Sequence, residues 1–200
     1  MSFQWIIDNA SEITAQSRPI VASTITRDGR VRSVSRGAQP WIFTVTLPNG
    51  PRWQEYRALI AQAEASGRFT DEVVQFNNAG HDWLFAYQGD MTSTLSASWT
   101  QGATSVSVTT PFGETGDKLV AGDLIQLNTN GPVYKVESTV PHTQNTVNVH
   151  RPILDNSGSG TINIGIDCTF TVRCTQFPDW TIFERDQIGW LGSFIFTEVF

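Results

Sequence analysis

The feature that most constrains this chain is a set of short alternating apolar runs between residues 121 and 154. The runs 121–127, 132–136 and 146–154 are separated by Gly, Asn and Pro residues, which favour turns. Alternation places one face of each strand in a core and the other face in water. We therefore expect a small β-barrel inserted into a different framework, which indicates an architectural part rather than a catalyst.

The segments before this module predict a framework of strands with one packing helix. Asp28-Gly29 between two β-branched runs is a strong hairpin signal, because a tight turn needs positive φ. Apolar residues at three- and four-residue steps predict one helix from Arg52 to Ser66, with Gly67 as its C-terminal cap. The expected strands are 20–26, 31–35, 41–47, 72–76 and 83–87.

Composition changes at about residue 91, where Thr, Ser, Gly, Asn and Val become frequent and no helical period remains. Asn156–Gly160 is interpreted as the linker that leaves the module, since it is rich in Gly and Ser. The apolar runs that follow it are expected to complete the first sheet. The predicted fold is mainly β, with a framework of residues 1–90 and 165–200 and an OB-like barrel of residues 91–164.

The bulk composition fits a folded protein of the cytosol. Of 200 residues, 40 % are hydrophobic, yet no run approaches the ~18 apolar residues of a membrane span, and no signal peptide is readable. Cys168 and Cys174 would lie on one face of a strand about 20 Å apart, beyond disulfide reach. We expect reduced core thiols, because a metal pair would need two further ligands that are not placed nearby.

No catalytic, cofactor-binding or metal-binding constellation is readable. The chain lacks a Gly-x-Ser-x-Gly elbow and a phosphate loop, and its three His residues are dispersed. Carboxylate pairs for glycoside cleavage stay open, because such pairs meet only in three dimensions. The module carries three basic and five acidic residues with few aromatics, which disfavours nucleic-acid binding. We expect a protein that is not an enzyme.

The single basic cluster consists of Arg27, Arg30, Arg32 and Arg36. Arg30, Arg32 and Arg36 share a parity, so an extended strand would place them on one face. That face is either a solvated hairpin surface or a subunit interface, since the Arg fork suits carboxylate partners. These three residues are the candidate interface site.

The order of the pieces resembles distal tail proteins of long-tailed bacteriophages, in the branch whose inserted domain is an OB-like barrel. The resemblance is carried by the Arg18-Pro19 approach, the Arg27–Arg30 hairpin, the aromatic strand from Trp41, the helix closed by Gly67, and Ala121-Gly122-Asp123-Leu124 followed by Val133-Tyr134-Lys135-Val136. The resemblance is one of architecture, and it extends over most of the chain.

The resemblance implies a homohexameric ring that joins the tail tube to the tail tip, with the framework forming the ring and the module projecting outward. Its partners would be further copies of itself, the tail tube protein and the hub or tip proteins, with side-fibre proteins as a further candidate. DNA would pass through without specific binding, in a virion part folded in the bacterial cytoplasm.

Two other functions stay open. Seven Trp residues allow a carbohydrate- or receptor-binding module of a tail tip, although Trp41, Trp53 and Trp83 lie on apolar-patterned faces and are interpreted as core. Another tail-tube or baseplate component would share much of the same physics.

Overall fold

The computed structural model describes residues 3–18, 21–25, 27–35, 39–66, 70–78, 80–110, 112–183 and 186–200. Strands make up 42 % of the described residues and helices 13 %, so the predicted mainly β fold is confirmed. The strand pairs among the described residues are antiparallel. Antiparallel sheets can pack one face and hydrate the other, which accounts for the alternating sequence pattern.

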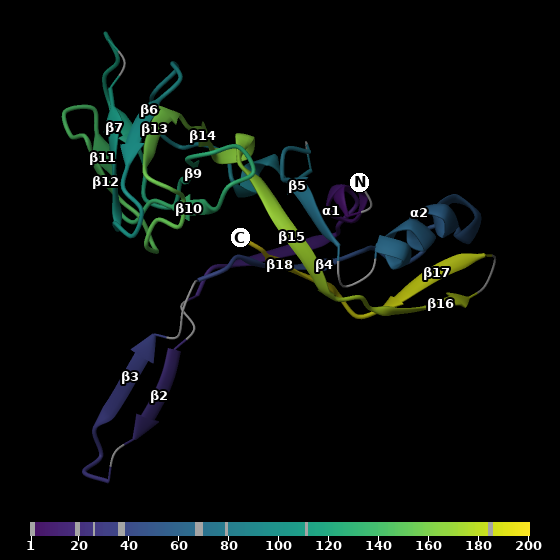
Figure 1. Cartoon of the computed structure of the whole chain (residues 1–200). Coiled ribbons are helices and arrows are strands. Elements are labelled where there is room, and N and C mark those ends of the chain that lie inside the picture. Colours follow the sequence, from purple (N-terminus) through teal and green to yellow (C-terminus); the bar gives the residue numbers. More distant parts are fainter. Residues whose placement is uncertain are drawn as a thin grey trace.

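A five-stranded sheet forms the framework (Figure 1). Its order is β1-β4-β18-β15-β5, so strands from both ends of the chain lie side by side. This confirms the prediction that the C-terminal segments complete the first sheet. The strands are β1 (Glu12–Gln16), β4 (Ile42–Thr46), β5 (Asp71–Gln75), β15 (Thr169–Gln176) and β18 (Phe194–Glu198).

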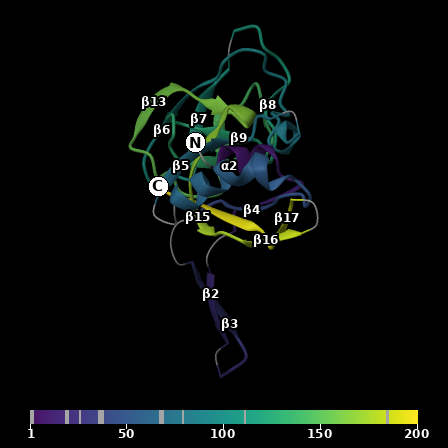
Figure 2. The same cartoon turned by 90° about the vertical axis from the view of Figure 1, so that its right-hand side faces the viewer.

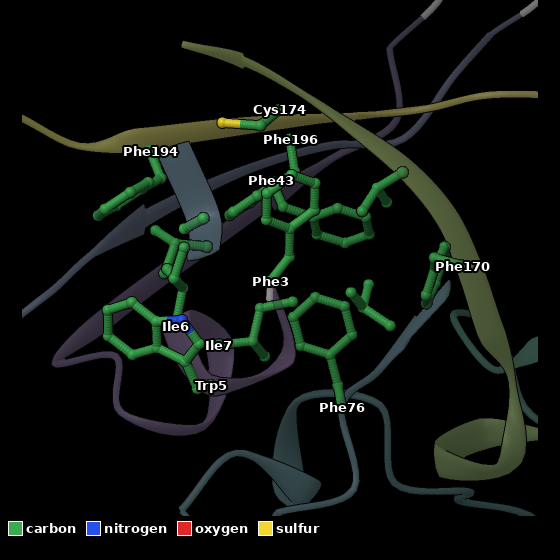
Figure 3. Close-up of a cluster of buried hydrophobic side chains, with 14 of the residues drawn as sticks. Phe3, Trp5, Ile6, Ile7, Phe43, Phe76, Phe170, Cys174, Phe194 and Phe196 are labelled. Atoms are coloured by element: carbon green, nitrogen blue, oxygen red, sulfur yellow. The ribbon is translucent and has the colours of Figure 1, made fainter. Parts of the chain in front are cut away.

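One face of this sheet carries the aromatic core shown in Figure 3. Phe43 of β4 is fully buried, and its ring centroid lies 4.9 Å from that of Phe170 on β15. Helix α1 (Gln4–Asp8), which the sequence pattern does not predict, buries Trp5, Ile6 and Ile7 in the same cluster. So short a helix is held by its packing rather than by its intrinsic propensity.

The predicted helix is confirmed as α2 (Trp53–Ser66), which buries Ile60 and Ala63 in the framework core. Its expected cap, Gly67, lies outside the described residues. Next to α2 lies the hairpin of β16 (Asp179–Phe183) and β17 (Gln187–Leu191). Stacking between Trp53 and Trp180, with centroids 4.7 Å apart, joins this hairpin to the helix.

The inserted module has a second hydrophobic cluster of its own. Its strands pair with one another in sheets of four, three and two strands. The domain limits at 91 and 164 and the closed barrel stay predictions. The strands are β6 (Ser96–Trp99), β7 (Ser105–Thr109), β8 (Asp117–Leu119), β9 (Leu124–Gln126), β10 (Val133–Lys135), β11 (Val140–Pro141), β12 (Thr146–Asn148), β13 (Gly158–Thr161) and β14 (Asn163–Ile164).

The predicted linker is wrong, because Gly158 to Thr161 form strand β13 and pair with β6. Gly158 lies against the indole of Trp99, where an added Cβ would be 3.2 Å from the ring. Glycine is therefore used here for close packing rather than for flexibility. Asn156 also belongs to the module, since its carbonyl accepts a hydrogen bond from Trp99 Nε1 at 2.8 Å.

The predicted strand at 83–87 is also wrong. Asp82–Leu84 form a short 3₁₀ helix, in which the amide of Leu84 donates to the carbonyl of His81. The turn just before it is closed by the carbonyl of Asn78, which accepts the amides of both His81 and Asp82. The turn rotates Trp83 outward, and the side chain is 69 % exposed instead of lying in the core. Trp41 is buried as predicted, and Trp53 is half-buried.

The predicted Asp-Gly hairpin is confirmed and projects from the rest of the molecule (Figures 1 and 2). It consists of β2 (Val21–Ile25) and β3 (Val31–Ser35), with Gly29 at φ +75° in the turn. Within the described part of the chain, these two strands pair only with each other. We call this hairpin the arm.

Candidate functional site

The arm exposes apolar side chains at its tip. Ile25 and Val31 are cross-strand partners, and their side chains are 74 % and 66 % exposed. Every arm side chain that the structure describes, at residues 23–25 and 27–31, is exposed. The β16–β17 hairpin differs, because Ile188 and Trp190 anchor it in the framework core.

The candidate interface arginines lie on or next to the arm. Arg30 stands between the turn and β3, and its Nε lies 3.5 Å from Asp28 Oδ2 in a solvent-exposed ion pair. Arg32 belongs to β3, but its side chain lies outside the described part, and so does the whole of Arg36. Whether the three arginines share a contact face stays a prediction.

A buried ion pair connects the module to the framework. Arg151 donates from both terminal nitrogens to the carboxylate of Glu198 at 2.9 and 2.8 Å, and both side chains are 2 % exposed. Arg151 also donates to the carbonyls of Gln39 and Val133, and Glu198 accepts the amides of Trp41 and Val133. The pair is therefore hydrogen-bonded on both sides, as a buried pair must be.

A buried glutamine makes a second connection between module and framework. Gln126 of β9 donates to the carbonyl of Thr169 at 2.6 Å and accepts the amide of Thr169 at 3.1 Å. The indole of Trp41 adds a hydrogen bond to the carbonyl of Val133. These bonds hold the module in one orientation on the framework.

His150, the two cysteines and Lys118 lie in or against the interior of the described structure. Burial, with the nearby charges of Arg151 and Lys135, lowers the pKa of His150 to about 3, and its Nδ1 accepts the amide of Lys135. Both cysteines are free and buried, as predicted, and burial raises the pKa of the Cys168 thiol. Lys118 is fully buried and donates to three oxygens, those of Val108, Gln144 and Asn145.

Sequence reasoning missed the buried Arg151–Glu198 pair, and it also missed a pocket of about 520 Å³ beside Trp83. It is lined by the 3₁₀ turn, by residues 91–95 and by the chain that returns from the module at 162–167. The turn-forming Asn77-Asn78 and Gly80 just before Trp83 were the available signal that this aromatic segment is not a regular strand.

Comparison with protein-family models and with curated proteins finds no match for this chain. Among the residues that the structure describes, no three His, Cys, Asp or Glu side chains are grouped as a metal site would require. Neither helix in that part of the chain has the length and apolar character to cross a bilayer.

Proposed function

We propose that this chain is a structural subunit of a bacteriophage tail, a distal tail protein that closes into a ring between the tail tube and the tail tip. The ring has six subunits in the family that the sequence resembles. The subunit acts by assembly and not by catalysis. It belongs to the virion tail tip, after folding in the cytoplasm of the host bacterium.

The arm is the observation that carries this function. An isolated two-stranded hairpin is marginally stable in water, because it buries little apolar surface. This arm also leaves Ile25 and Val31 in solvent at its tip, where a partner surface would cover them. A projecting hairpin of this kind is suited to lie on a neighbouring molecule.

Charge complementarity favours a second copy of this chain as that neighbour. The hairpin segment 21–35 contains three Arg and one Asp, whereas the whole chain has a net charge of −6. The surface outside the arm is therefore acidic on balance, and it attracts the arm of the next subunit. Arg30, Arg32 and Arg36 stay the candidate residues for this contact.

The framework sheet offers edges that a ring would cover. β1 and β5 lie at its two ends, so each has one side without a strand partner in the described structure. On β5 the side chain of Gln4 already bonds the amide and the carbonyl of Gln75, so β1 is the edge that a neighbour would pair. Exposed edges must be paired, covered or charged in a stable protein. Contacts between two different surfaces close into a ring when the rotation between subunits divides a full turn.

A negative net charge also suits a channel for DNA. Phosphate groups are repelled by acidic surfaces, so an acidic lining lets DNA pass without being retained. The tail tube protein and the hub or tip proteins are the expected partners above and below the ring, and side-fibre proteins are a further candidate. The alternatives are a receptor- or carbohydrate-binding module at the tip and another tail-tube or baseplate component.

Electron microscopy of tails labelled with an antibody against this chain tests the assignment. We expect the label on the tail axis at the junction of tube and tip, with a ring in averaged images. Label on single copies at fibre ends would contradict the ring and would support the receptor-binding alternative.

Arm variants test the contact itself. The double variant Ile25→Asp and Val31→Asp should abolish ring formation in the assembled tail without changing the thermal unfolding of the monomer, since both side chains are exposed. Arg30→Glu with Arg32→Glu tests the arginine contact separately. Thr146→Asp, at an exposed position on β12, is the control and should leave the ring intact. Normal rings from both arm variants would rule out the arm as an interface.

A further inference from the structure

We propose that the pocket beside Trp83 binds a neutral saccharide. Of the seven Trp residues, all within the described structure, Trp83 alone is exposed. An aromatic side chain left in water beside a pocket of about 520 Å³ presents an apolar surface for a ligand to cover. The flat apolar face of a sugar ring is a suitable partner for an indole.

The indole is held in place before any ligand arrives. Trp83 Nε1 donates to the carbonyl of Gly80 at 3.0 Å, within the same turn. This bond fixes the ring edge, while the residue stays 69 % exposed. A side chain that is already ordered loses little conformational freedom on binding, so the contact contributes more to affinity.

The polar groups of the pocket are mainly hydrogen-bond acceptors. Thr92 Oγ1 and Ser93 Oγ both donate to Glu114 Oε1, at 2.8 and 2.7 Å. Each hydroxyl has therefore used its proton and presents its lone pairs to a ligand. Asp82 and Asp167 also line the pocket. A ligand rich in hydroxyl donors satisfies such a site.

The charge of the site selects among saccharides. Asp82 and Asp167 in the lining and Glu114 behind it place three acidic side chains around the pocket. The hydrogen bonds from Ser93 and Thr92 lower the pKa of Glu114, so this group stays negative. Uronic acids, sialic acids and phosphorylated sugars are repelled, and neutral sugars are accepted.

This inference goes beyond the structural role proposed above and does not depend on it. The pocket is built from the turn at Trp83 and from residues 91–95 and 162–167, all remote in sequence from the arm. Binding there would give a ring subunit contact with glycans of the bacterial surface. Sugar binding and ring formation can therefore be tested separately.

The test is titration of the whole protein with neutral sugars, namely glucose, galactose, mannose, rhamnose, N-acetylglucosamine and their disaccharides, followed by calorimetry and ligand-observed NMR. We expect at least one to bind, and Trp83→Ala to weaken it about tenfold or more. Trp83→Phe should restore part of the affinity. Phe112→Ala, which removes a fully exposed aromatic side chain that does not line the pocket, is the matched control and should bind normally.

Asp167→Asn tests the acceptor role, and we expect about a tenfold loss because a carboxylate binds a hydroxyl more strongly than an amide does. Absence of binding by all these sugars at about 10 mM, roughly tenfold above a millimolar Kd, would overturn the saccharide assignment. So would unchanged binding by Trp83→Ala, or tighter binding of acidic sugars. A lysine-rich peptide that bound in a Trp83-dependent way would instead identify a protein partner. Assembled tails that carry Trp83→Ala should still show the ring, so loss of sugar binding is distinguished from a failure of the assembly role.

Discussion

Arg151 of the module and Glu198 of the framework form a doubly hydrogen-bonded ion pair in the interior, 47 residues apart in sequence. Removing one partner leaves a buried charge without compensation, which typically costs about 3–5 kcal/mol. We expect Glu198→Ala to lower the free energy of unfolding by about that amount, measured by chemical denaturation. Asp71→Asn breaks the exposed Arg173–Asp71 pair and is the control, with an expected cost of about 0–1 kcal/mol. Equal losses in the two variants would contradict the structural role of the buried pair.

Excision of residues 91–164 tests the predicted domain limits. A short Gly-Ser bridge should leave a framework that unfolds cooperatively, because closing a modest loop costs only a few kcal/mol. The remainder should be less stable than the whole chain, since Glu198 and Trp41 lose their partners Arg151 and Val133. Calorimetry of the excised protein checks this. Loss of any cooperative transition would show that the framework and the module fold as one unit.

The stability of the protein should fall in acid through His150. Its pKa is about 3 in the folded protein and 6.5 without the fold, so the unfolded chain binds the additional proton between these values. The contribution is complete above pH 6.5 and is lost as the pH falls toward 3. His150→Asn retains an acceptor for the Lys135 amide. We expect this variant to show a smaller fall in melting temperature between pH 6.5 and 4 than the natural protein does. Parallel pH profiles of the variant and the natural protein would exclude this role.

Lys118 should stabilise the module through its three hydrogen bonds. Lys118→Met keeps the length of the side chain but leaves the oxygens of Val108, Gln144 and Asn145 without their donor. Of these acceptors only the Val108 carbonyl belongs to a buried residue, since Gln144 and Asn145 are exposed. One unsatisfied buried acceptor costs about 1–3 kcal/mol, so we expect a loss of that size in chemical denaturation. A more stable variant would show that burying the ammonium group costs more than its bonds return.

Gly165 should not tolerate a side chain. It lies where the chain returns from the module, at φ +60°, and an added Cβ would be 2.8 Å from the carbonyl oxygen of Phe85. We expect Gly165→Ala to lower the free energy of unfolding by at least about 2 kcal/mol, from left-handed backbone strain together with overpacking. Gly160→Ala is the matched control, because no atom lies within 4 Å of its added Cβ and its φ is ordinary. A thermal shift no larger than that of the control would contradict this reading of the turn.

Local sequence patterns were sufficient to predict the elements that depend only on residues close together in the chain. Asp28-Gly29 predicts the arm because positive φ at Gly29 is a property of the turn itself. The alternation of Trp41, Phe43 and Val45 predicts β4, and the apolar stripe of 53–66 predicts α2, since a repeat of two or of 3.6 residues places these side chains on one face.

Tertiary structure decided the features that depend on distant partners. The Gly-Ser segment at 158–161 is a strand because β6 lies beside it, and Trp83 is exposed because the turn bonded to Asn78 directs it away from the core. Neither the pairing of Arg151 with Glu198 nor the position of Asp167 near Trp83 follows from any local period. By itself, the sequence determined a mainly β chain with an Asp-Gly hairpin, because each of those elements depends on near neighbours along the chain. That the hairpin projects as an arm was decided by the folded structure, in which β2 and β3 pair only with each other within the described residues. Only the folded structure decided which polar groups are buried together and which aromatic is exposed, because those contacts join residues that no repeat relates.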